Sequence, residues 1–168
     1  MIEGGSPSEG GDDMAFDTPN GTRGARQPGR SRIERWGNQR MVERIRRKGD
    51  RSGKKLVLVT IGKKSGLERM TPVAWFPSEG ETRLIVASAS GAPRNPSWYY
   101  NIAAHPDEVR IEFAGQRIEV TAEQLHGAER ASAWRMITTK SPGFARYERI
   151  TDRVVPVIRL TPKADGAS

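Results

Sequence analysis

The sequence contains no cysteine and only two histidines among its 168 residues. Without cysteine there can be no disulfide bond, no thiolate-bound metal and no cysteine nucleophile. His105 and His126 lie far apart and lack a helical ligand spacing, so we expect no zinc or non-haem iron site. Long apolar runs are also missing: nothing approaches the roughly 18 residues of a membrane span, and no secretory signal is visible. We therefore expect a cytoplasmic protein whose membrane contact, if any, is peripheral and at the inner face.

Negative charge is scarce in one part of the chain. Between residues 23 and 64 there are fifteen lysines and arginines and only three acids, which is a net charge of +12. The whole chain has a formal charge of +8, so the remainder carries −4. A basic arm on a mildly acidic domain predicts an anionic partner. Cofactor phosphate, a membrane surface and nucleic acid are the three candidates at this point.

Large apolar side chains are almost absent at the amino-terminal end, and such a segment cannot offset the entropy of ordering. The predicted parts of the chain are a disordered tail (1–31), a basic amphipathic helix (32–49), a barrel domain (54–163) and a short tail (164–168). For the helix, Ser31 is the expected N-cap, Glu34 completes a capping box and Gly49 ends it. Its arginines favour a solvated face across the domain, contact with anionic lipid or, more weakly, DNA.

Strand patterns dominate the chain after the basic arm. We predict strands at 55–61, 69–76, 83–90 and 154–160, a hairpin over 107–125 turning at Gly115 and Gln116, and helices at 95–106, 127–140 and 144–152. Pro72 implies a sheet edge or a bulge. Strands outnumber helices and tight hairpins join many of them. The predicted class is α+β, mainly β: a small, mostly antiparallel barrel or rolled sheet with helices packed around it.

The stretch "GKKSGLERMTP" follows a buried-strand pattern directly. It is not a Walker A loop, because the glycine spacing is wrong. Amides freed by Gly62 and Gly66 can nevertheless point at one anion, with Lys63, Lys64 and Arg69 around it. The structural alternative is a lysine-rich hairpin turn that keeps a sheet edge from pairing with other chains.

Two further clusters follow. In "ASASGAPRNPSWYYN" a run of small residues leaves a strand with little bulk, against which a flat ring could lie. Trp98 and Asn101 come next, three apart on one face of a helix. In "SPGFARYERITD" the pair Phe144 and Tyr147 also share a helical face, and a tyrosine hydroxyl can orient a carbonyl or supply a proton. Each cluster has a structural alternative, in which the aromatic residues only pack.

The remaining polar residues carry no hydrolytic pattern. Asp152 and Arg153 are expected to make structural ion pairs. There is neither a Ser-His-Asp arrangement nor a spaced carboxylate pair, so hydrolysis has no support.

Three segments taken together resemble the deazaflavin-dependent nitroreductase family. They are "VTIGKKSGLERMTPVAWF", "VASASGAPRNPSWYYNIAAHPDEVRIEFAGQRIEVTA" and "YERITDRVVPVIRLTP". The joint pattern G-[RK]-K-[ST]-G-x-x-R with N-P-x-W-Y-x-N is specific to it. Members are actinobacterial oxidoreductases that use coenzyme F420, also described as quinone reductases, and the resemblance implies their split β-barrel fold.

The resemblance also implies roles for individual residues. The residues implied to hold the phosphate and oligoglutamate tail of F420 are Lys63, Lys64, Ser65, Gly66 and Arg69. Those implied to line the path to the deazaflavin ring are Thr71, Pro72 and Val73; those lying against it are Val86, Ala87 and Ser88; and those closing the site are Trp98 and Asn101. Tyr147 and Ser88 are the candidates for orienting the acceptor or supplying a proton.

The chain departs from the family pattern at three positions. Members that activate nitroimidazoles carry tyrosines where this chain has Ser141 and Phe144, and a lysine is common at the position of Ala89. The resemblance therefore implies hydride transfer from reduced F420 to a quinone, enone or nitro-type acceptor, with a preference for hydrophobic ones. The alternatives are an FMN-binding split barrel and a non-catalytic protein that binds F420 or a fatty acid. We expect no nucleic-acid partner, an anionic membrane surface as an optional one, and a monomer or homodimer.

Overall fold

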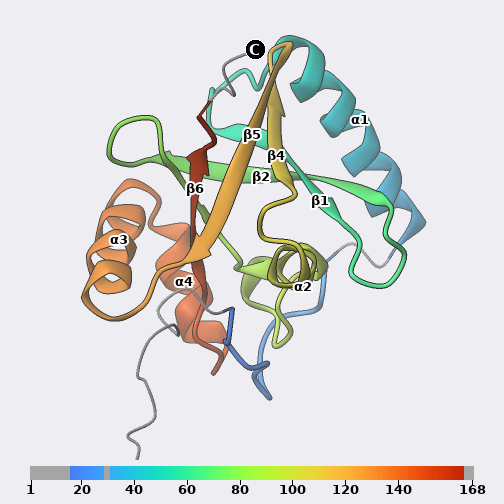
Figure 1. Cartoon of the computed structure of the whole chain (residues 1–168). Helices are drawn as coiled ribbons and strands as arrows, with labels where there is room; N and C mark the ends of the chain where they lie inside the picture. Colours follow the sequence, from blue (N-terminus) through green and yellow to red (C-terminus); the bar gives the residue numbers. More distant parts are fainter. Residues whose placement is uncertain (1–15, 29–30, 165–168) are drawn as a thin grey trace, which may run out of the picture.

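The structure, a computed structural model, describes residues 16–28 and 31–164. Six strands in these residues close a barrel in the order β1-β2-β3-β6-β5-β4, and all neighbouring pairs are antiparallel (Figure 1). The strands are β1 (Lys55–Ile61), β2 (Glu68–Pro77), β3 (Arg83–Val86), β4 (Val109–Phe113), β5 (Gln116–Gln124) and β6 (Val157–Pro162). The predicted antiparallel barrel is confirmed.

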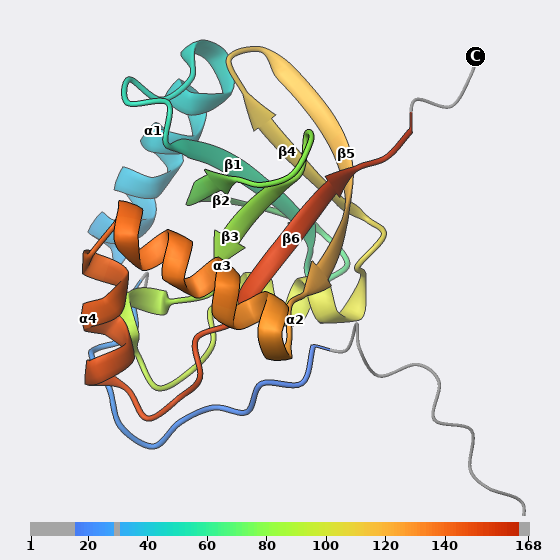
Figure 2. The same ribbon diagram turned by 90° about the vertical axis from the view of Figure 1, so that its left-hand side faces the viewer.

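Helices cover the barrel on two sides and at one end. They are α1 (Arg32–Lys48), η2 (Ala89–Gly91, a short 3-10 helix), α2 (Ser97–Ala104), α3 (Gly127–Lys140) and α4 (Gly143–Ile150). The long helix α1 packs on the outside of β1, β2 and β4, whereas α3 and α4 lie together beside β6 (Figures 1 and 2). The prediction of helices packed around the barrel is confirmed.

The continuous apolar run of β1 is explained by burial on both faces. Leu56 and Leu58 point into the barrel, where they belong to its main hydrophobic core. Val57 and Val59 point outward and pack under Val42 of α1. Alternate residues of a strand face opposite sides, so a strand covered on both sides must be apolar throughout.

Only the second half of α1 contacts the barrel. Its capping box is present as predicted: Ser31 Oγ accepts from the Glu34 N–H at 3.0 Å, and Glu34 returns a bond to the Ser31 N–H at 3.1 Å. Val42 and Ile45 are buried, but residues 32–40 are all exposed. The helix thus projects its basic first half beyond the sheet that anchors it.

The outward face of β4 is polar, as the alternation predicts, yet it is not solvated. Arg110 forms a two-pronged hydrogen bond with Glu68 at the start of β2. Next to it, Glu112 lies 3.4 Å from the guanidinium of Arg46 on α1. Arg110 and Glu112 are only 9% and 7% exposed. Paired charges under α1 therefore replace the solvent that the alternating pattern suggests.

Pro72 lies on an open strand edge, as predicted. Residues 68–74 of β2 pair with β1, whereas β3 pairs only with residues 75–77. Pro72 is opposite Val57 on one side and needs no N–H donor on the other. The barrel is consequently split along the first half of β2.

Three predicted boundaries were wrong. The last strand, expected to begin at residue 154, begins at Val157, directly after Pro156, which has no N–H to donate to a neighbouring strand. The hairpin between β4 and β5 turns at Ala114 and Gly115, with φ of 48° and 77°, because Gln116 pairs directly with Phe113. The third strand ends at Val86 instead of residue 90. There the chain turns away through three successive residues of positive φ, Ala89, Ser90 and Gly91, which cannot continue a strand.

Candidate functional site

A basic turn, residues 62–69, joins β1 to β2 at the split edge. Its backbone closes through two hydrogen bonds, from the Gly62 N–H to Leu67 O at 2.8 Å and from the Gly66 N–H to Gly62 O at 2.9 Å. Gly66 has φ of 68°, a conformation that glycine adopts without strain. Ser65 Oγ accepts from the Leu67 N–H at 3.2 Å and from Arg69 at 3.4 Å. Ser65 and Gly66 thus shape the turn that the sequence predicts.

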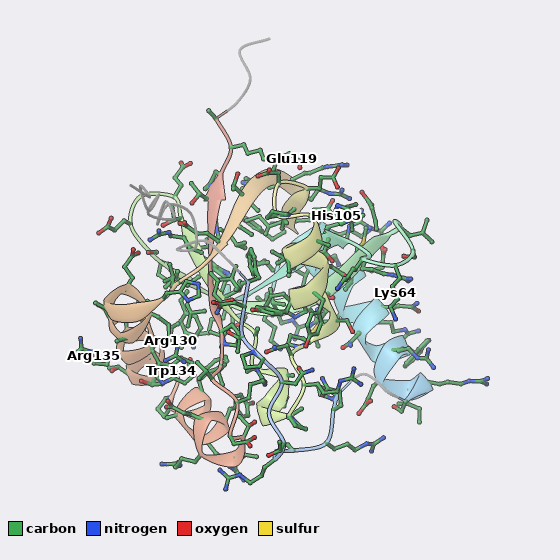
Figure 3. All side chains as sticks on the ribbon, turned by 60° about the horizontal axis from the view of Figure 1, so that its bottom comes forward. Lys64, His105, Glu119, Arg130, Trp134 and Arg135 are labelled. Carbon is green, nitrogen blue, oxygen red and sulfur yellow. The ribbon has the colours of Figure 1, made fainter. Side chains whose placement is uncertain are left out.

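The three cations of the basic turn are exposed. Across residues 16–28 and 31–164, no carboxylate lies within salt-bridge distance of Lys63, Lys64 or Arg69. Figure 3 shows Lys64 on the side of the molecule that carries α1, whose exposed first half is also basic. Uncompensated cations around one tight turn suit a phosphate or carboxylate ligand.

Asn101 on α2 ties the basic turn to the barrel. Its side-chain oxygen accepts from the Lys63 N–H at 2.9 Å, and its side-chain nitrogen donates to Thr60 Oγ1 at 3.2 Å. Asn101 is only 8% exposed. Its amide is thus already engaged by the protein, and its first effect is to position the turn.

Trp98, predicted beside Asn101, lies in the main barrel core and is 7% exposed. The packing role that the sequence left open for it is present; a cofactor contact at its edge stays a prediction. Thr71 and Pro72 are half-buried and Val73 is buried in the same core. These three residues run along the open edge of β2, directly after the basic turn.

A ledge of small residues, 86–92, continues from the end of β3. Val86 and Ala87 are buried and Ser88 is half-buried. The ledge leads through residues 93–96 into α2, the helix that carries Asn101. One short helix therefore connects the ledge to the basic turn, and the predicted clusters come together at the same end of the barrel.

Tyr147 lies on α4, next to the ledge. The α-carbon of Tyr147 is so close to Gly91 that a Cβ on that glycine would lie 3.5 Å away. Its ring packs edge-on to Phe144, with centroids 5.6 Å apart, and Phe144 packs in turn on Phe76. Within the described residues, neither the Tyr147 hydroxyl nor that of Ser88 forms a hydrogen bond. Both hydroxyls are free to meet a small molecule.

The amino-terminal segment differs from the prediction. Residues 1–15 and 29–30 of the expected disordered tail lie outside the described residues, but residues 16–28 form a strap across the ledge and α2. Its backbone bonds the ledge region directly, from the Gly21 N–H to Pro93 O at 2.7 Å and from the Ala25 N–H to Gly91 O at 3.0 Å. Phe16 packs edge-on to Tyr99. Phe16, a lone large aromatic residue in a polar segment, was the signal that could have revealed the strap.

Asp152 holds the middle of the strap. Its carboxylate accepts from the Thr22 N–H and the Arg23 N–H, both at 2.9 Å, and from the Thr22 hydroxyl at 2.5 Å. The Thr22 hydroxyl contributes most, and together these bonds lower the pKa of Asp152 to about 2. The predicted ion pairs of Asp152 and Arg153 are absent from the described part of the chain: Asp152 binds strap amides, and Arg153 binds backbone carbonyls.

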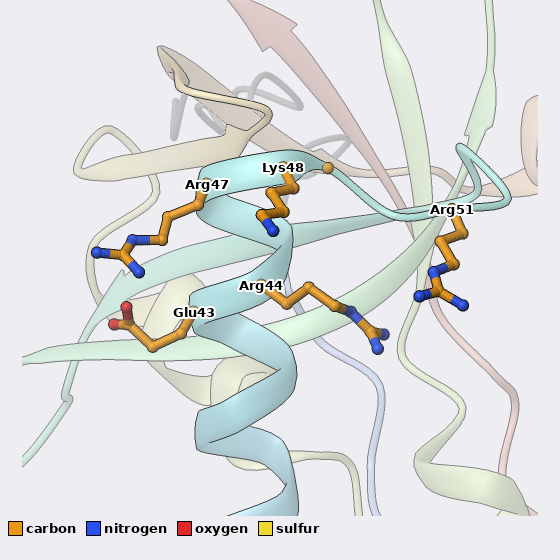
Figure 4. Close-up of a pocket in the computed structure, with 6 residues that line it drawn as sticks. Glu43, Arg44, Arg47, Lys48 and Arg51 are labelled. Atoms are coloured by element: carbon orange, nitrogen blue, oxygen red, sulfur yellow. The ribbon is translucent and has the colours of Figure 1, made fainter.

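A second cationic surface lies at the carboxyl end of α1. Figure 4 shows a hollow there, lined by Glu43, Arg44, Arg47, Lys48, Gly49 and Arg51. Cations in the last turn of a helix interact favourably with its dipole, so this cluster has a structural reason of its own. It lies at the other end of β1 from the basic turn.

The described residues contain no cluster of metal-ligating side chains and no long apolar helix. No group of three or more histidine or acidic side chains is placed to hold a metal ion there. Within the same residues, no helix has the length and apolar character that crossing a bilayer requires.

Comparison with known proteins gives one family match. The family model described as F420H(2)-dependent quinone reductase matches residues 31–162. An F420H(2)-dependent quinone reductase of Mycobacterium tuberculosis (strain ATCC 25618 / H37Rv) is 37% identical over 109 residues, which cover 63% of this chain and 72% of the relative.

Two solved structures are also similar. One is an F420-H2 dependent reductase (FDR-A), with 33% identity, a TM-score of 0.57, and coverage of 64% of this chain and 93% of that one. The other is titled a domain-swapped dimer, with 31% identity, a TM-score of 0.58, and coverage of 75% and 95%. The strap lies before the first residue of the family match.

Proposed function

The chain belongs to the F420H(2)-dependent quinone reductase family, and we propose that it transfers a hydride from reduced F420 to a hydrophobic quinone-type acceptor beside the ledge. It is an oxidoreductase with F420 as cofactor, as its relatives and structural neighbours indicate. The finer points, namely the site residues, the acceptor and the surface contacts, are our own proposals.

The observation that carries the site assignment is the basic turn. F420 bears a phosphate and an acidic tail, and the turn presents Lys63, Lys64 and Arg69 without any carboxylate partner in the described part of the chain. Asn101 fixes the position of that turn. The residues present thus fit an anionic cofactor, and Arg69 is suited to grip an oxygen pair while the lysines act as point charges.

Each predicted residue then has a proposed task. When bound, the deazaflavin supplies the hydride, and the protein provides binding, orientation and exclusion of water. Thr71, Pro72 and Val73 line the path from the basic turn, and Val86, Ala87 and Ser88 give a shelf thin enough for a flat ring. Trp98 backs that shelf from the barrel core.

The acceptor is proposed to sit against α4. Phe144 presents a ring where nitroimidazole-activating relatives have a hydroxyl, so this wall is more apolar than theirs. Tyr147 retains a hydroxyl that is not engaged by the described residues. It can donate a hydrogen bond to a quinone oxygen and hold or supply the proton there. Ser88 is the second candidate for this task.

A binding titration tests the site. F420 and FMN are titrated against the wild type and against Lys64→Ala and Arg69→Ala. Loss of one charged partner should weaken F420 binding by about 1–3 kcal/mol, roughly ten- to a hundredfold. Lys140→Ala, which removes an exposed cation at the end of α3, is the control and should change nothing.

Two outcomes would contradict the proposal. Unchanged F420 affinity in the double variant would place the anion elsewhere, and a preference for FMN would assign the chain to another group of split barrels. Oxidation of reduced F420 by menadione measures catalysis separately. Tight cofactor binding without turnover of any quinone or enone would favour the non-catalytic binding protein.

We also propose that the first half of α1 rests on an anionic membrane surface. The support is three exposed apolar side chains with lysines and arginines near them in the sequence: Ile33 is 82% exposed, Trp36 57% and Leu67, in the basic turn, 63%. Tryptophan and aliphatic side chains surrounded by arginine and lysine suit the boundary between headgroups and acyl chains. A lipid-dissolved quinone would then be close to the site.

Vesicle flotation tests this contact. The wild type should float with vesicles containing phosphatidylglycerol and not with phosphatidylcholine alone, and Ile33→Ser with Trp36→Ser should abolish flotation. Val154→Ser, at a residue 58% exposed elsewhere, is the matched control. Equal flotation of all variants would exclude α1 as the contact.

The oligomeric state is a separate proposal. A similar solved structure is titled a domain-swapped dimer, and we keep both a monomer and a homodimer as predictions for this chain. Light scattering across a concentration series distinguishes them.

A further inference from the structure

Arg153 is a buried cation without a carboxylate partner. It follows α4, is 4% exposed, and belongs to no ion pair among the residues that the structure describes. Its neighbour Asp152 is turned away and bound to the strap. Burial lowers the pKa of the Arg153 guanidinium. A lone buried charge is costly, so its retention here requires a specific reason.

The partners of the Arg153 guanidinium lie in the ledge or, for Asn95, just after it. Nη1 donates to Ala87 O at 2.9 Å and to Asn95 Oδ1 at 2.7 Å. Nη2 donates to Ser88 O at 2.8 Å and to Ala92 O at 3.1 Å, and Nε donates to Ala92 O at 3.2 Å. The planar guanidinium therefore binds backbone carbonyls on both sides of one turn, residues 89–91, at the same time.

The turn between these anchors is strained. Ala89 and Ser90 have φ of 45° and 55°, in the left-handed region that residues with a Cβ adopt only under strain. Such a conformation persists only where its surroundings impose it. The guanidinium does so, because it binds the carbonyls of Ala87 and Ser88 before the turn and that of Ala92 after it.

We propose that Arg153 is a positioning residue of the F420 site, which sets the backbone of the ledge at the height and tilt that hydride transfer requires. The inference rests on the proposed function. Because the guanidinium of Arg153 binds the ledge region and no residue of the basic turn, it governs orientation and leaves binding of the cofactor's anionic part to Lys63, Lys64 and Arg69. A substitution of Arg153 should therefore lower the rate of hydride transfer without weakening the affinity for F420.

The test compares Arg153→Lys with Arg130→Lys. Lysine keeps the charge but cannot span both sides of the turn. Arg130 is a matched control: it lies on α3 against Trp134, donates to Val155 O at 2.8 Å, and also has its pKa lowered by burial (Figure 3). Arg130 binds none of the four residues that the Arg153 guanidinium holds.

The first readout needs no cofactor. Hydrogen exchange of the protein alone should speed up over residues 86–95 in Arg153→Lys and stay at the wild-type rate there in Arg130→Lys. The second readout is steady-state kinetics with reduced F420 and menadione, corrected for folded fraction. In Arg153→Lys, kcat should fall about tenfold or more while the KM for reduced F420 stays within about threefold, because a small misplacement costs rate first.

The outcomes separate the two proposals. Unchanged exchange at the ledge, or a normal kcat in Arg153→Lys, overturns the inference alone. A fall in kcat of the same size in Arg130→Lys also overturns it, because the effect would then be general destabilisation. Absence of F420 binding or turnover in the wild type overturns the proposed function, and with it the role of Arg153 towards the cofactor.

Discussion

The side-chain oxygen of Asn101 accepts a hydrogen bond from the backbone N–H of Lys63 at 2.9 Å, so a helix at one end of the barrel fixes a turn 38 residues earlier in the chain. The same amide donates to Thr60 inside β1. The position of the cationic turn is thus set by a buried polar bridge and not by the turn alone.

Replacing Asn101 by leucine should loosen the basic turn. The change leaves the Lys63 N–H and the Thr60 hydroxyl without partners, at a cost of about 1–3 kcal/mol in the free energy of unfolding. F420 affinity should fall as well, because the cations must be ordered on binding. Urea unfolding and cofactor titration measure the two effects. Gln116→Leu, at an exposed hairpin position, is the control, and an Asn101 variant with wild-type affinity would contradict the bridge's role.

Gly24→Ala should release the strap. A Cβ at residue 24 would lie 2.3 Å from Gly91 O and 2.8 Å from Pro93 N, which are backbone atoms that cannot swing aside. We expect destabilisation of about 1–3 kcal/mol and faster proteolysis within residues 16–28. Gly37→Ala on α1 is the matched control: nothing lies within 4 Å of its added Cβ, so stability should stay equal or rise. Equal protease resistance of the two variants would argue against a tightly packed strap.

Acid should detach the strap through Asp152. The pKa of Asp152 is lowered from its usual 3.8 to about 2, so the folded state binds this proton less readily than the unfolded state does. This contribution to stability is complete above the unfolded pKa and is lost as the pH falls from about 4 towards 2. Urea unfolding across that window should show a shallower pH dependence in Asp152→Asn. An identical slope would mean that other carboxylates, such as Glu68, whose pKa is also lowered, account for it.

Arg110→Met should cost far more than a surface substitution of the same kind. It removes the two-pronged partner of Glu68 and leaves the neighbouring Glu112 less compensated under α1. Glu112 is buried, but the Glu68 side chain is 46% exposed and becomes solvated when Arg110 is lost, so the cost should stay below the roughly 3–5 kcal/mol of breaking a fully buried pair. Arg117→Met breaks an exposed 3.9 Å contact with Glu119 and should cost about 0–1 kcal/mol. Comparable losses of stability for the two variants in chemical denaturation would show that the burial of Arg110 and Glu112 under α1 does not raise the cost.

Tyr147→Phe tests the proposed hydroxyl. If it donates to the acceptor, kcat with menadione should fall by about 10² or more, with the KM for reduced F420 unchanged. Folding should be unaffected, since that hydroxyl bonds nothing in the described residues. The control is Tyr100→Phe, which removes a hydroxyl bonded to Asn20 at 2.6 Å outside the proposed acceptor wall. A Tyr147→Phe variant with the wild-type kcat would show that the Tyr147 hydroxyl does not serve the acceptor, and would leave Ser88 as the candidate.

Local sequence patterns predicted helices and strands well where interactions between residues close in the sequence determine the element. The capping box of Ser31 and Glu34, the glycine after α1 and the apolar run of β1 each act within a few residues, so the sequence alone defines them. The joint motif pattern likewise predicted that the basic turn and the ledge belong to one site. In the structure, α2 connects them.

The predictions failed where a segment is held by hydrogen bonds to residues far away in the sequence. Residues 16–28 lack the apolar surface to fold alone, yet their polar groups meet partners such as Asp152, some 130 residues away. Arg153 was expected to pair with an acid, but it binds carbonyls exposed by a strained turn, which no sequence spacing reveals. The third strand ended early for the same reason.

The strap has a practical consequence for anyone who shortens this protein. The region shared with the family begins at residue 31, so a truncation chosen by homology would delete every residue from Phe16 to Gln27. Gly91 and Pro93 would lose their backbone donors, and Asn95, one of the groups that Arg153 holds, would lose its contacts with Thr18 and Asn20. Low activity in such a truncated protein would therefore be explained by the loss of the strap. It would say nothing about which substrate the enzyme prefers.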